Sequence, residues 1–411
     1  METHLPENEA MNEQVASAGG EFFIPAAMRR ASLHFLENEA LLFDKAHQAL
    51  YGLNASAAFI WCCLEDGMDA RATIEGLQTT FELSPGQAQE QLASFLDQWR
   101  MLTPRDGVGE PVNLRSLMPP MQLADFPGAA MENDDLGVRR NYRILGINVA
   151  VRYATRALEE AIHPFISHFE TGPDACSQVD LAVVPDGDDV VFVTEDREID
   201  RCSGLEHLTA YIKMCLLLIA LDRSVDFCAV HAAALETDGR GLLLPGRSQS
   251  GKSTLAAALA AAGFGFLGDD TIVLAAETLE ARAVPFGISV KDGAWDLLAS
   301  RFPRLPDLPI HVRPDGKRVR YLLPDALRLE SRVPVNWIVF PEYSAEADAE
   351  LVPLSRPVAL SQLLRGVTAL GDGLTSAKVD RLVQWIGRAD CYVLRLSSLD
   401  PAVALLADLC R

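Results

Sequence analysis

The segment Gly246–Ser253 limits what this chain can fold into more than any other part of its sequence. Its letters, GRSQSGKS, fit the pattern G-x-x-x-x-G-K-[ST] in full. In this pattern the glycines let successive backbone N–H groups point at phosphate oxygens, the lysine supplies a cation, and the final hydroxyl is a Mg²⁺ ligand. The segment therefore predicts a phosphate-binding loop for a nucleoside triphosphate.

The flanking residues match the setting that such a loop needs. The apolar residues 242–244 before it predict a strand, and the Ala-rich run KSTLAAALAAA predicts a helix whose positive end faces the anion. The alternative is a Gly-Ser loop that only joins a strand to a helix. The predicted nucleotide contacts are Gly246, Arg247, Ser248, Gln249, Ser250, Gly251, Lys252, Ser253 and Thr254.

Two adjacent carboxylates follow the next apolar run. Asp269 and Asp270 come after residues 264–267 and before the apolar Ile272–Leu274. At a strand edge, one carboxylate can complete a Mg²⁺ shell while the other accepts a proton from an attacking hydroxyl. The alternative is a solvated Asp-Asp turn between two strands.

The overall composition narrows the class of protein. The chain has 411 residues, of which 49% are hydrophobic, and a net charge of −21. It is long enough for two or three globular domains, and its negative charge repels nucleic acid and anionic lipid heads. Its acidic N-terminus differs from a signal peptide, its longest apolar run is too short to span a membrane, and its scattered cysteines suit reduced thiols. We therefore expect a cytoplasmic protein with no nucleic-acid or membrane partner.

Local patterns predict an α/β chain, α+β overall, with two domains. Residues 1–20 predict a disordered lead and residues 105–135 a linker, which leaves a first domain over 21–104 and a second over 136–411. In the first domain we expect three strands and then three helices that begin after Asn54, at Ala72 and after Pro85. The strands are expected at Ser32–Leu36, Ala40–Asp44 and Gln48–Leu53.

The second domain is expected to mix strands and helices ahead of the loop. The predicted strands are Tyr142–Ala154, Ala229–Leu235 and Gly241–Leu244, with a hairpin over Val179–Thr194. The predicted helices are Ala157–Phe169 and Leu205–Leu221, and a further helix begins at Lys252.

Several motifs of the second domain occur together in one kinase family. They are the strand with His231, GRGLLLPGRSQSGKST, GFGFLGDD, VPFGISVKDG, WIVFPEY and the segment from Cys391 onward. This set, which spans about residues 139–411, resembles HPr kinase and its relatives, which have a phosphoenolpyruvate-carboxykinase-like nucleotide fold.

The resemblance implies an enzyme that transfers the γ-phosphoryl group of ATP, with Mg²⁺, to a serine hydroxyl on a protein. It assigns Asp269 as general base and Asp270 as metal partner beside Ser253, although the two aspartates could exchange roles. The family's histidine falls on His231, whose alternative is a satisfied core residue. Lys291 could neutralise charge on the transferring phosphoryl group, as Lys252 does, and its alternative is a surface lysine. Arg318 and Arg320 are weaker candidates of the same kind.

Two features depart from the family pattern. The Arg- and Glu-bearing motif of the reverse, phosphate-consuming reaction is not apparent, and the loop ends Gly-Lys-Ser-Thr where the bacterial regulators typically have Gly-Lys-Ser-Glu. Both weigh against a role in sugar regulation and leave the reverse reaction open. HPr kinases assemble as oligomers, so the question of a homo-oligomer also stays open.

The first domain points to a substrate. Over about residues 30–104, three strands precede three helices, and Leu53–Ala57 (LNASA) resembles the LNPTGA of the PqqD family. PqqD domains are small, winged-helix-like modules that bind the leader of a ribosomally made peptide while a partner enzyme modifies its core. Because an extended peptide can add a strand to an open sheet edge, we expect a groove between Gln48–Leu53 and the helix after Pro85. The alternative is a generic winged or three-helix scaffold for dimerisation.

Together the two resemblances predict a Ser/Thr peptide kinase that binds a precursor peptide and phosphorylates its core with Mg-ATP. A bound leader raises the local concentration of a weakly bound core, so the kinase site need not recognise much sequence. One alternative is a kinase for a regulatory protein or small molecule, and another is an ATP-switched peptide chaperone. Phosphate loops bind phosphates rather than bases, so the preference for ATP or GTP stays open. The identity of the peptide also stays open.

Overall fold

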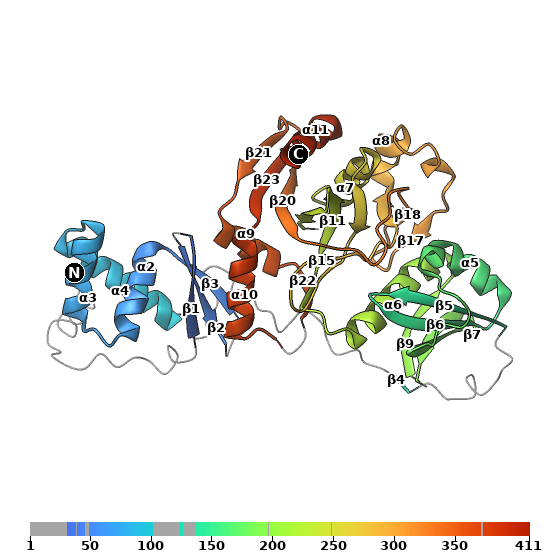
Figure 1. Ribbon diagram of the computed structural model, residues 1–411, viewed down its shortest axis with the longest axis horizontal. Coiled ribbons are helices and arrows are strands. Elements are labelled where there is room, and N and C mark those ends of the chain that lie inside the picture. Colours follow the sequence, from blue (N-terminus) through green and yellow to red (C-terminus); the bar gives the residue numbers. More distant parts are fainter. Residues whose placement is uncertain are drawn as a thin grey trace, which may run out of the picture. The chain divides into compact units, whose positions relative to one another are not determined.

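The computed structural model describes residues 31–37, 39–45, 49–101, 124–125, 137–195, 197–247, 249–370 and 373–411. Its structure is mixed α/β, as the sequence predicts, and it divides into two compact units (Figure 1). One contains residues 1–113 and 375–383, and the other contains residues 114–374 and 384–411. The predicted disordered lead and nearly all of the predicted linker lie outside the described residues.

The N-terminal unit has the three strands and three helices that were predicted. Its antiparallel sheet has the order β1-β2-β3. Asn54 caps the first helix as expected, because its side chain accepts a hydrogen bond from the Ala57 N–H at 2.8 Å. Gln48, the predicted start of the third strand, lies outside the described residues. The elements are β1 (Ala31–Leu36), β2 (Glu39–Asp44), β3 (Ala49–Leu53), α2 (Ala55–Glu65), α3 (Ala70–Phe81) and α4 (Pro85–Met101).

The middle strand of this sheet is buried on both faces. Leu42 packs into the core formed with the three helices, whereas Leu41 and Phe43, which are also buried, point to the opposite face because side chains alternate along a strand. On that face lies the first half of α10 (Ser376–Ile386), where the carboxylate of Asp380 is 2.6 Å from His34 Nδ1. The N-terminal unit therefore includes a helical segment that is distant in sequence.

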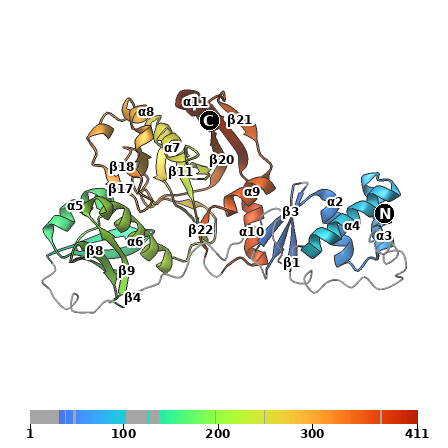
Figure 2. The ribbon, with the colours of Figure 1, turned by 180° about the vertical axis from the view of Figure 1, so that it is seen from behind.

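The C-terminal unit begins with a six-stranded sheet of order β4-β9-β8-β7-β6-β5, against which α5 and α6 pack (Figure 2). The predicted hairpin is confirmed as β7 and β8, and the two predicted helices are found as α5 with a 3-10 turn and as α6. The elements are β4 (Ala124–Asp125), β5 (Val138–Ile144), β6 (Ile147–Tyr153), α5 (Arg156–Ile166), β7 (Val179–Asp186), β8 (Asp189–Thr194), β9 (Arg197–Ser203) and α6 (Leu208–Arg223).

The single strand predicted over Tyr142–Ala154 is wrong, because the chain reverses in its middle. Leu145 and Gly146 have φ values of +51° and +78°, and Ile144 pairs with Ile147 across the turn. Two positive φ angles in a two-residue turn are typical of a tight hairpin. Leucine at the first position hides the turn from sequence patterns, since this residue rarely adopts positive φ.

The remaining strands of this unit form two larger sheets and a small one. Their orders are β13-β11-β12-β20-β23-β21, β19-β15-β14-β10-β22 and β16-β18-β17. Their strands are β10 (Cys228–Val230), β11 (Ala232–Thr237), β12 (Arg240–Pro245), β13 (Gly265–Gly268), β14 (Ile272–Leu274), β15 (Ala281–Arg282), β16 (Ile288–Lys291), β17 (His311–Val312), β18 (Arg318–Leu322), β19 (Arg332–Val333), β20 (Val335–Tyr343), β21 (Glu350–Pro353), β22 (Val367–Leu370) and β23 (Asp390–Leu396).

The strand predicted over Ala229–Leu235 is also wrong, since it divides at His231 into strands of two different sheets. β10 pairs with β14 and β22, whereas β11 pairs with β12 and β13. Between them the His231 N–H donates to the Gly366 carbonyl at 2.6 Å. The apolar run is continuous through this point, so the sequence has no signal for the change of sheet.

Helix α7 (Lys252–Ala261) is buried on nearly every side. Its residues 255–260 pack with α11 (Leu399–Leu409) and with strands of the six-stranded and three-stranded sheets around it. Alanine side chains are small enough to let neighbouring backbones approach from several directions. Within the described part of the chain no helix has both the length and the apolar character needed to cross a bilayer, and the eight cysteines are free thiols.

Candidate active site

The segment Gly246–Ser253 joins β12 to α7 in the strand–loop–helix order that the sequence predicts. Gly251, the N-cap of the helix, has φ +92°, which favours glycine, and a Cβ on Gly246 would meet Ser250 Oγ at 2.8 Å. Ser250 Oγ is buried and has no hydrogen-bond partner among the described residues. An unsatisfied buried hydroxyl in such a loop fits a bound phosphate oxygen. Thr254 lies in the first turn of the helix, Arg247 and Gln249 are exposed, and Ser248 lies outside the described residues.

Lys252 places its ammonium group inside the loop. Only 5% of the residue is exposed, and Nζ donates to the carbonyls of Gly246 at 2.8 Å and Arg247 at 3.0 Å. Burial lowers the pKa of Lys252, and the nearby Asp269 and Asp270 oppose this shift. A buried cation at this point suits the triphosphate of a nucleotide, which carries several negative charges.

Ser253 and Asp269 form a pair of oxygen ligands beside the loop. The Ser253 hydroxyl donates to Asp269 Oδ1 at 3.1 Å, and the Ser289 N–H donates to Oδ2 at 3.2 Å. Asp269 is 1% exposed, so its carboxylate is closed to solvent. Mg²⁺ commonly takes only one or two protein oxygens and completes its shell with water and phosphates. This pair therefore fits Mg²⁺, although the described residues hold no larger cluster of acidic, His or Cys ligands.

Asp270 faces a different environment from its neighbour. Its backbone has φ +68°, which turns the chain sharply, and its carboxylate lies 3.4 Å from Lys213 Nζ and 3.6 Å from Arg313 Nη1. Its carbonyl accepts a hydrogen bond from His231 Nδ1 at 2.8 Å. With Nδ1 carrying the proton, His231 Nε2 holds a lone pair, and it lies 3.2 Å from Lys252 Nζ. Burial and the adjacent Lys252 lower the pKa of His231.

The two aspartates have pKa values shifted in opposite directions. Burial, and then the charge of Asp270, raise the pKa of Asp269. Burial also acts on Asp270, but Lys213 and Arg313 outweigh it and lower the pKa of that carboxylate. At neutral pH Asp270 is therefore ionised and paired, whereas an ionised Asp269 is costly unless a cation is bound.

This difference predicts opposite stability changes in metal-free protein at pH 7.5. Because the folded-state pKa of Asp269 is raised, its charge destabilises the fold above that pKa. Asp269→Asn should therefore raise the melting temperature, roughly 2–4 °C for each ~1 kcal/mol in a domain of about 150–250 residues. Asp270→Asn should lower the melting temperature, because its folded-state pKa is lowered and its charge is stabilising. Thermal unfolding with a chelator measures both. The Asp269→Asn difference should shrink as the pH falls through the raised pKa of Asp269, whereas the Asp270→Asn difference should persist until the pH falls through the lowered pKa of Asp270. Equal shifts of one sign at pH 7.5 would contradict this account.

The structure brings together most of the predicted site residues but not all of them. His231, Lys252, Ser253, Asp269 and Asp270 form one contact cluster. Lys291 follows Ser289 by two positions on β16, so both side chains leave the same face of that strand. The guanidinium groups of Arg318 and Arg320 instead lie over the ring of Trp295 at 5.6 and 4.4 Å.

Three members of the cluster were not predicted from the sequence, namely Lys213, Ser289 and Arg313. The sequence does contain a signal that could have identified Lys213, since this residue is a lone cation within the apolar stretch of α6. Ser289 lay inside a quoted motif, but nothing in it indicated that its N–H would reach Asp269. The sequence contains no such signal for Arg313. This residue follows a two-residue strand, β17, and lies near Asp270 only because of the tertiary fold.

Comparison with known proteins bears on the N-terminal unit. Residues 39–102 match the family described as "Coenzyme PQQ synthesis protein D (PqqD)". This match confirms the resemblance noted for residues 30–104. No curated protein matches the chain.

Solved structures also include similar chains. One is the "Hpr(Ser) kinase/phosphatase from Coxiella burnetii", with 14% identity and a TM-score of 0.22, covering 44% of this chain and 92% of that one. At this TM-score the likeness does not define the fold or the activity. The chemistry of the site therefore rests on the contacts described above.

Proposed function

We propose that this chain is an ATP-dependent kinase that phosphorylates a Ser or Thr hydroxyl in the core of a precursor peptide whose leader its PqqD-like domain binds. The observation that carries the kinase part is the 3.1 Å contact between Ser253 and Asp269, directly after a loop that holds the buried Lys252. A lysine, a hydroxyl and a carboxylate in this arrangement suit the phosphates and metal of a nucleoside triphosphate.

The loop and the first turn of α7 would hold the triphosphate. Backbone N–H groups of residues 246–254 and the unpartnered Ser250 hydroxyl would contact phosphate oxygens, with Lys252 as the cation. Ser253 and Asp269 would hold Mg²⁺. When bound, this ion neutralises phosphate charge that would otherwise repel an incoming hydroxyl.

Asp270 is the better candidate for the base, which exchanges the roles first assigned to the two aspartates. Asp269 is closed to solvent and already accepts hydrogen bonds from Ser253 and Ser289, so an acceptor hydroxyl cannot reach it. Asp270 is partly exposed and ionised, and Lys213 and Arg313 fix its position. A positioned carboxylate within reach of the acceptor is what general-base catalysis requires.

In the proposed transfer, the acceptor oxygen forms a bond to the γ-phosphorus as the bond to the ADP oxygen breaks. The hydroxyl proton passes to the carboxylate of Asp270. Lys252, Arg313 and Lys291 supply positive charge around the moving phosphoryl group, which is the main contribution a protein can make to this reaction. Neutral His231 orients the Asp270 backbone and accepts from Lys252.

The N-terminal unit would supply the substrate. In the sheet of order β1-β2-β3, β3 is an edge strand, and an extended leader could pair with it. Binding there converts encounter with the core into an intramolecular event, which can raise the effective concentration to roughly the millimolar range. A kinase site with few contacts to the acceptor sequence is then sufficient.

Leader binding should depend on β3 and not on the opposite edge. Tyr51→Ala on β3 should weaken leader binding by about tenfold or more, because Tyr51 is a half-buried aromatic on this edge. Phe35→Ala on β1 is the matched control, since Phe35 is an aromatic that is 62% exposed on the other edge strand. Fluorescence polarisation of a labelled leader measures both affinities. Loss of binding with Phe35→Ala alone would move the leader to β1.

Isotope transfer tests the proposed reaction. The full chain is incubated with precursor peptide and ATP labelled with ³²P at either the γ or the α position. Label should reach the peptide from γ-labelled ATP only. Transfer from α-labelled ATP would indicate nucleotidyl transfer, and absence of transfer from both would contradict a kinase.

A further inference from the structure

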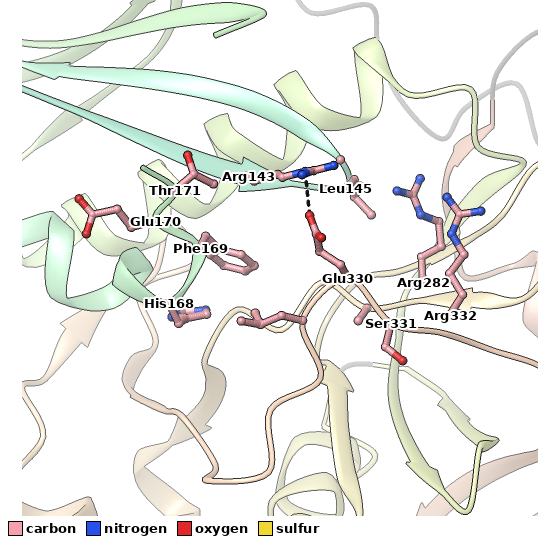
Figure 3. Close-up of a pocket in the computed structure, with 13 residues that line it drawn as sticks. Arg143, Leu145, His168, Phe169, Glu170, Thr171, Arg282, Glu330, Ser331 and Arg332 are labelled. Carbon is pink, nitrogen blue, oxygen red and sulfur yellow. Dashed lines mark ion pairs between the residues drawn. The ribbon is translucent and has the colours of Figure 1, made fainter. Parts of the chain in front are cut away.

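The C-terminal unit contains a cavity of about 420 Å³ that shares no lining residue with the candidate active site (Figure 3). Three arginines, Arg143, Arg282 and Arg332, line it together with two glutamates, Glu170 and Glu330. One of the glutamates, Glu170, pairs with Arg140, a cation that it shares with Glu159. The lining therefore carries a positive excess in a chain whose net charge is −21.

Two of these arginines lie directly opposite each other on neighbouring strands. Arg282 of β15 pairs in register with Arg332 of β19, and Figure 3 shows their side chains next to each other. Like charges at facing positions of a sheet repel each other. Arg282 forms a largely buried ion pair with Asp226, but the Arg332 side chain has no ion-pair partner among the described residues. Arg332 is thus an exposed cation, close to a second one, without a counter-ion in the part of the chain that the structure describes.

The third arginine, Arg143, is held only by a weak ion pair. Arg143 Nε lies 2.8 Å from the carboxylate of Glu330, but both side chains are about half exposed, at 49% and 55%. Such surface ion pairs are weak and are readily exchanged. Glu330 holds a φ of +52°, which is unfavourable for a residue with a Cβ and which recurs at ligand sites in proteins. Its carboxylate is positioned as an internal anion that a stronger anion can replace.

The cavity is polarised along its length. Phe169 and His168 lie toward one end in Figure 3, and Arg282 and Arg332 lie at the other. His168 Nε2 meets the Pro285 carbonyl at 3.0 Å, and burial lowers the pKa of His168 to about 4, so its imidazole is uncharged at neutral pH. Glu170, which pairs with Arg140, lies at the same end in Figure 3. A ligand whose anionic group binds at the arginine end, and whose other end carries no second negative charge, would match both ends.

We propose that this cavity is a binding site for a small phosphate-bearing ligand, separate from the nucleotide site. Arg332 is its main ligand, Arg282 assists, and Arg143 joins when the anion displaces Glu330. A carboxylate has only two oxygens, which are too few to accept hydrogen bonds from three guanidinium groups in full. A phosphate group presents three terminal oxygens to the planar N–H forks.

Phosphate binding to the full chain tests this site, with inorganic phosphate as the probe. Because the loop at residues 246–253 also binds phosphate, every protein in the comparison carries Lys252→Ala. Titration calorimetry should detect binding in this background, and adding Arg332→Gln should weaken it at least tenfold. Arg332 is exposed, so the substitution leaves the core intact. Arg156→Gln is the matched control, because Arg156 is an exposed arginine of the same unit in a surface pair with Glu160.

A second variant tests the part assigned to Glu330. Glu330→Gln removes the internal anion and should strengthen phosphate binding several-fold, and acetate should bind far more weakly than phosphate. The proposal fails if Arg332→Gln leaves the phosphate affinity unchanged, if Glu330→Gln weakens binding, or if acetate binds as tightly as phosphate.

Discussion

Replacing Lys252 with methionine should lower the rate of phosphoryl transfer by about 10²–10³-fold or more, because it removes the buried cation from the proposed phosphate loop. Methionine keeps an unbranched apolar stem of similar length, so the packing of α7 should remain. The carbonyls of Gly246 and Arg247 lose their shared donor, which is a local cost within the loop. Transfer of γ-label measures the rate, and circular dichroism measures the fold.

Lys317→Met is the control for this substitution. Lys317 is a surface lysine whose ammonium pairs with Asp315, at 3.0 Å. It should retain the transfer rate of the unchanged protein. Full activity in Lys252→Met with the fold intact would show that Gly246–Ser253 is not the phosphate site, whatever its sequence pattern.

Changing each aspartate to asparagine should impair a different step, either phosphoryl transfer or Mg-ATP binding. Asp270→Asn should keep the affinity for Mg-ATP and lose about 10²–10⁴-fold in transfer, because the proposed base is removed. Asp269→Asn should weaken Mg-ATP binding and increase the Mg²⁺ concentration needed, because a carboxylate ligand becomes a neutral amide. The amide can still accept from the Ser289 N–H and donate to the Ser253 hydroxyl, so the pocket keeps its hydrogen bonds.

Nucleotide affinity and transfer rate must be measured separately to distinguish these failures. Calorimetry with Mg-ATP provides the first and label transfer the second. If Asp269→Asn retained Mg-ATP affinity but lost transfer while Asp270→Asn lost affinity, the roles would be those first assigned from the family resemblance. Unchanged behaviour of both variants would leave the pair as a structural turn.

Local sequence signals predicted the parts of the fold that depend on neighbouring residues. Asn54 caps its helix through a contact three positions away, and the segment Gly246–Ser253 joins a strand to the helix that adjoins it. Short-range capping and glycine geometry determine both features. Leu145 is the exception, because a leucine takes a backbone conformation that sequence statistics assign to glycine or asparagine.

The missed features depend on contacts between distant residues. Lys213 and Arg313 reach Asp270 from 57 and 43 positions away, and neither spacing has a motif. The break at His231 arises because one apolar run serves two sheets, which periodicity cannot reveal. The contact between His34 and Asp380 of α10 is similar, because the two residues are 346 positions apart and no local pattern links them.

Mass spectrometry of a precursor peptide tests the central claim most directly. The full chain is incubated with Mg-ATP and the short precursor peptides encoded beside its gene, and the same peptides without their leaders serve as controls. We predict a gain of about 80 Da on a Ser or Thr of the core, the mass of one phosphoryl group. The gain should be absent with Lys252→Met and about 10²–10⁴-fold slower without the leader. A peptide that binds the N-terminal unit but gains no mass would contradict the kinase and favour an ATP-switched peptide chaperone.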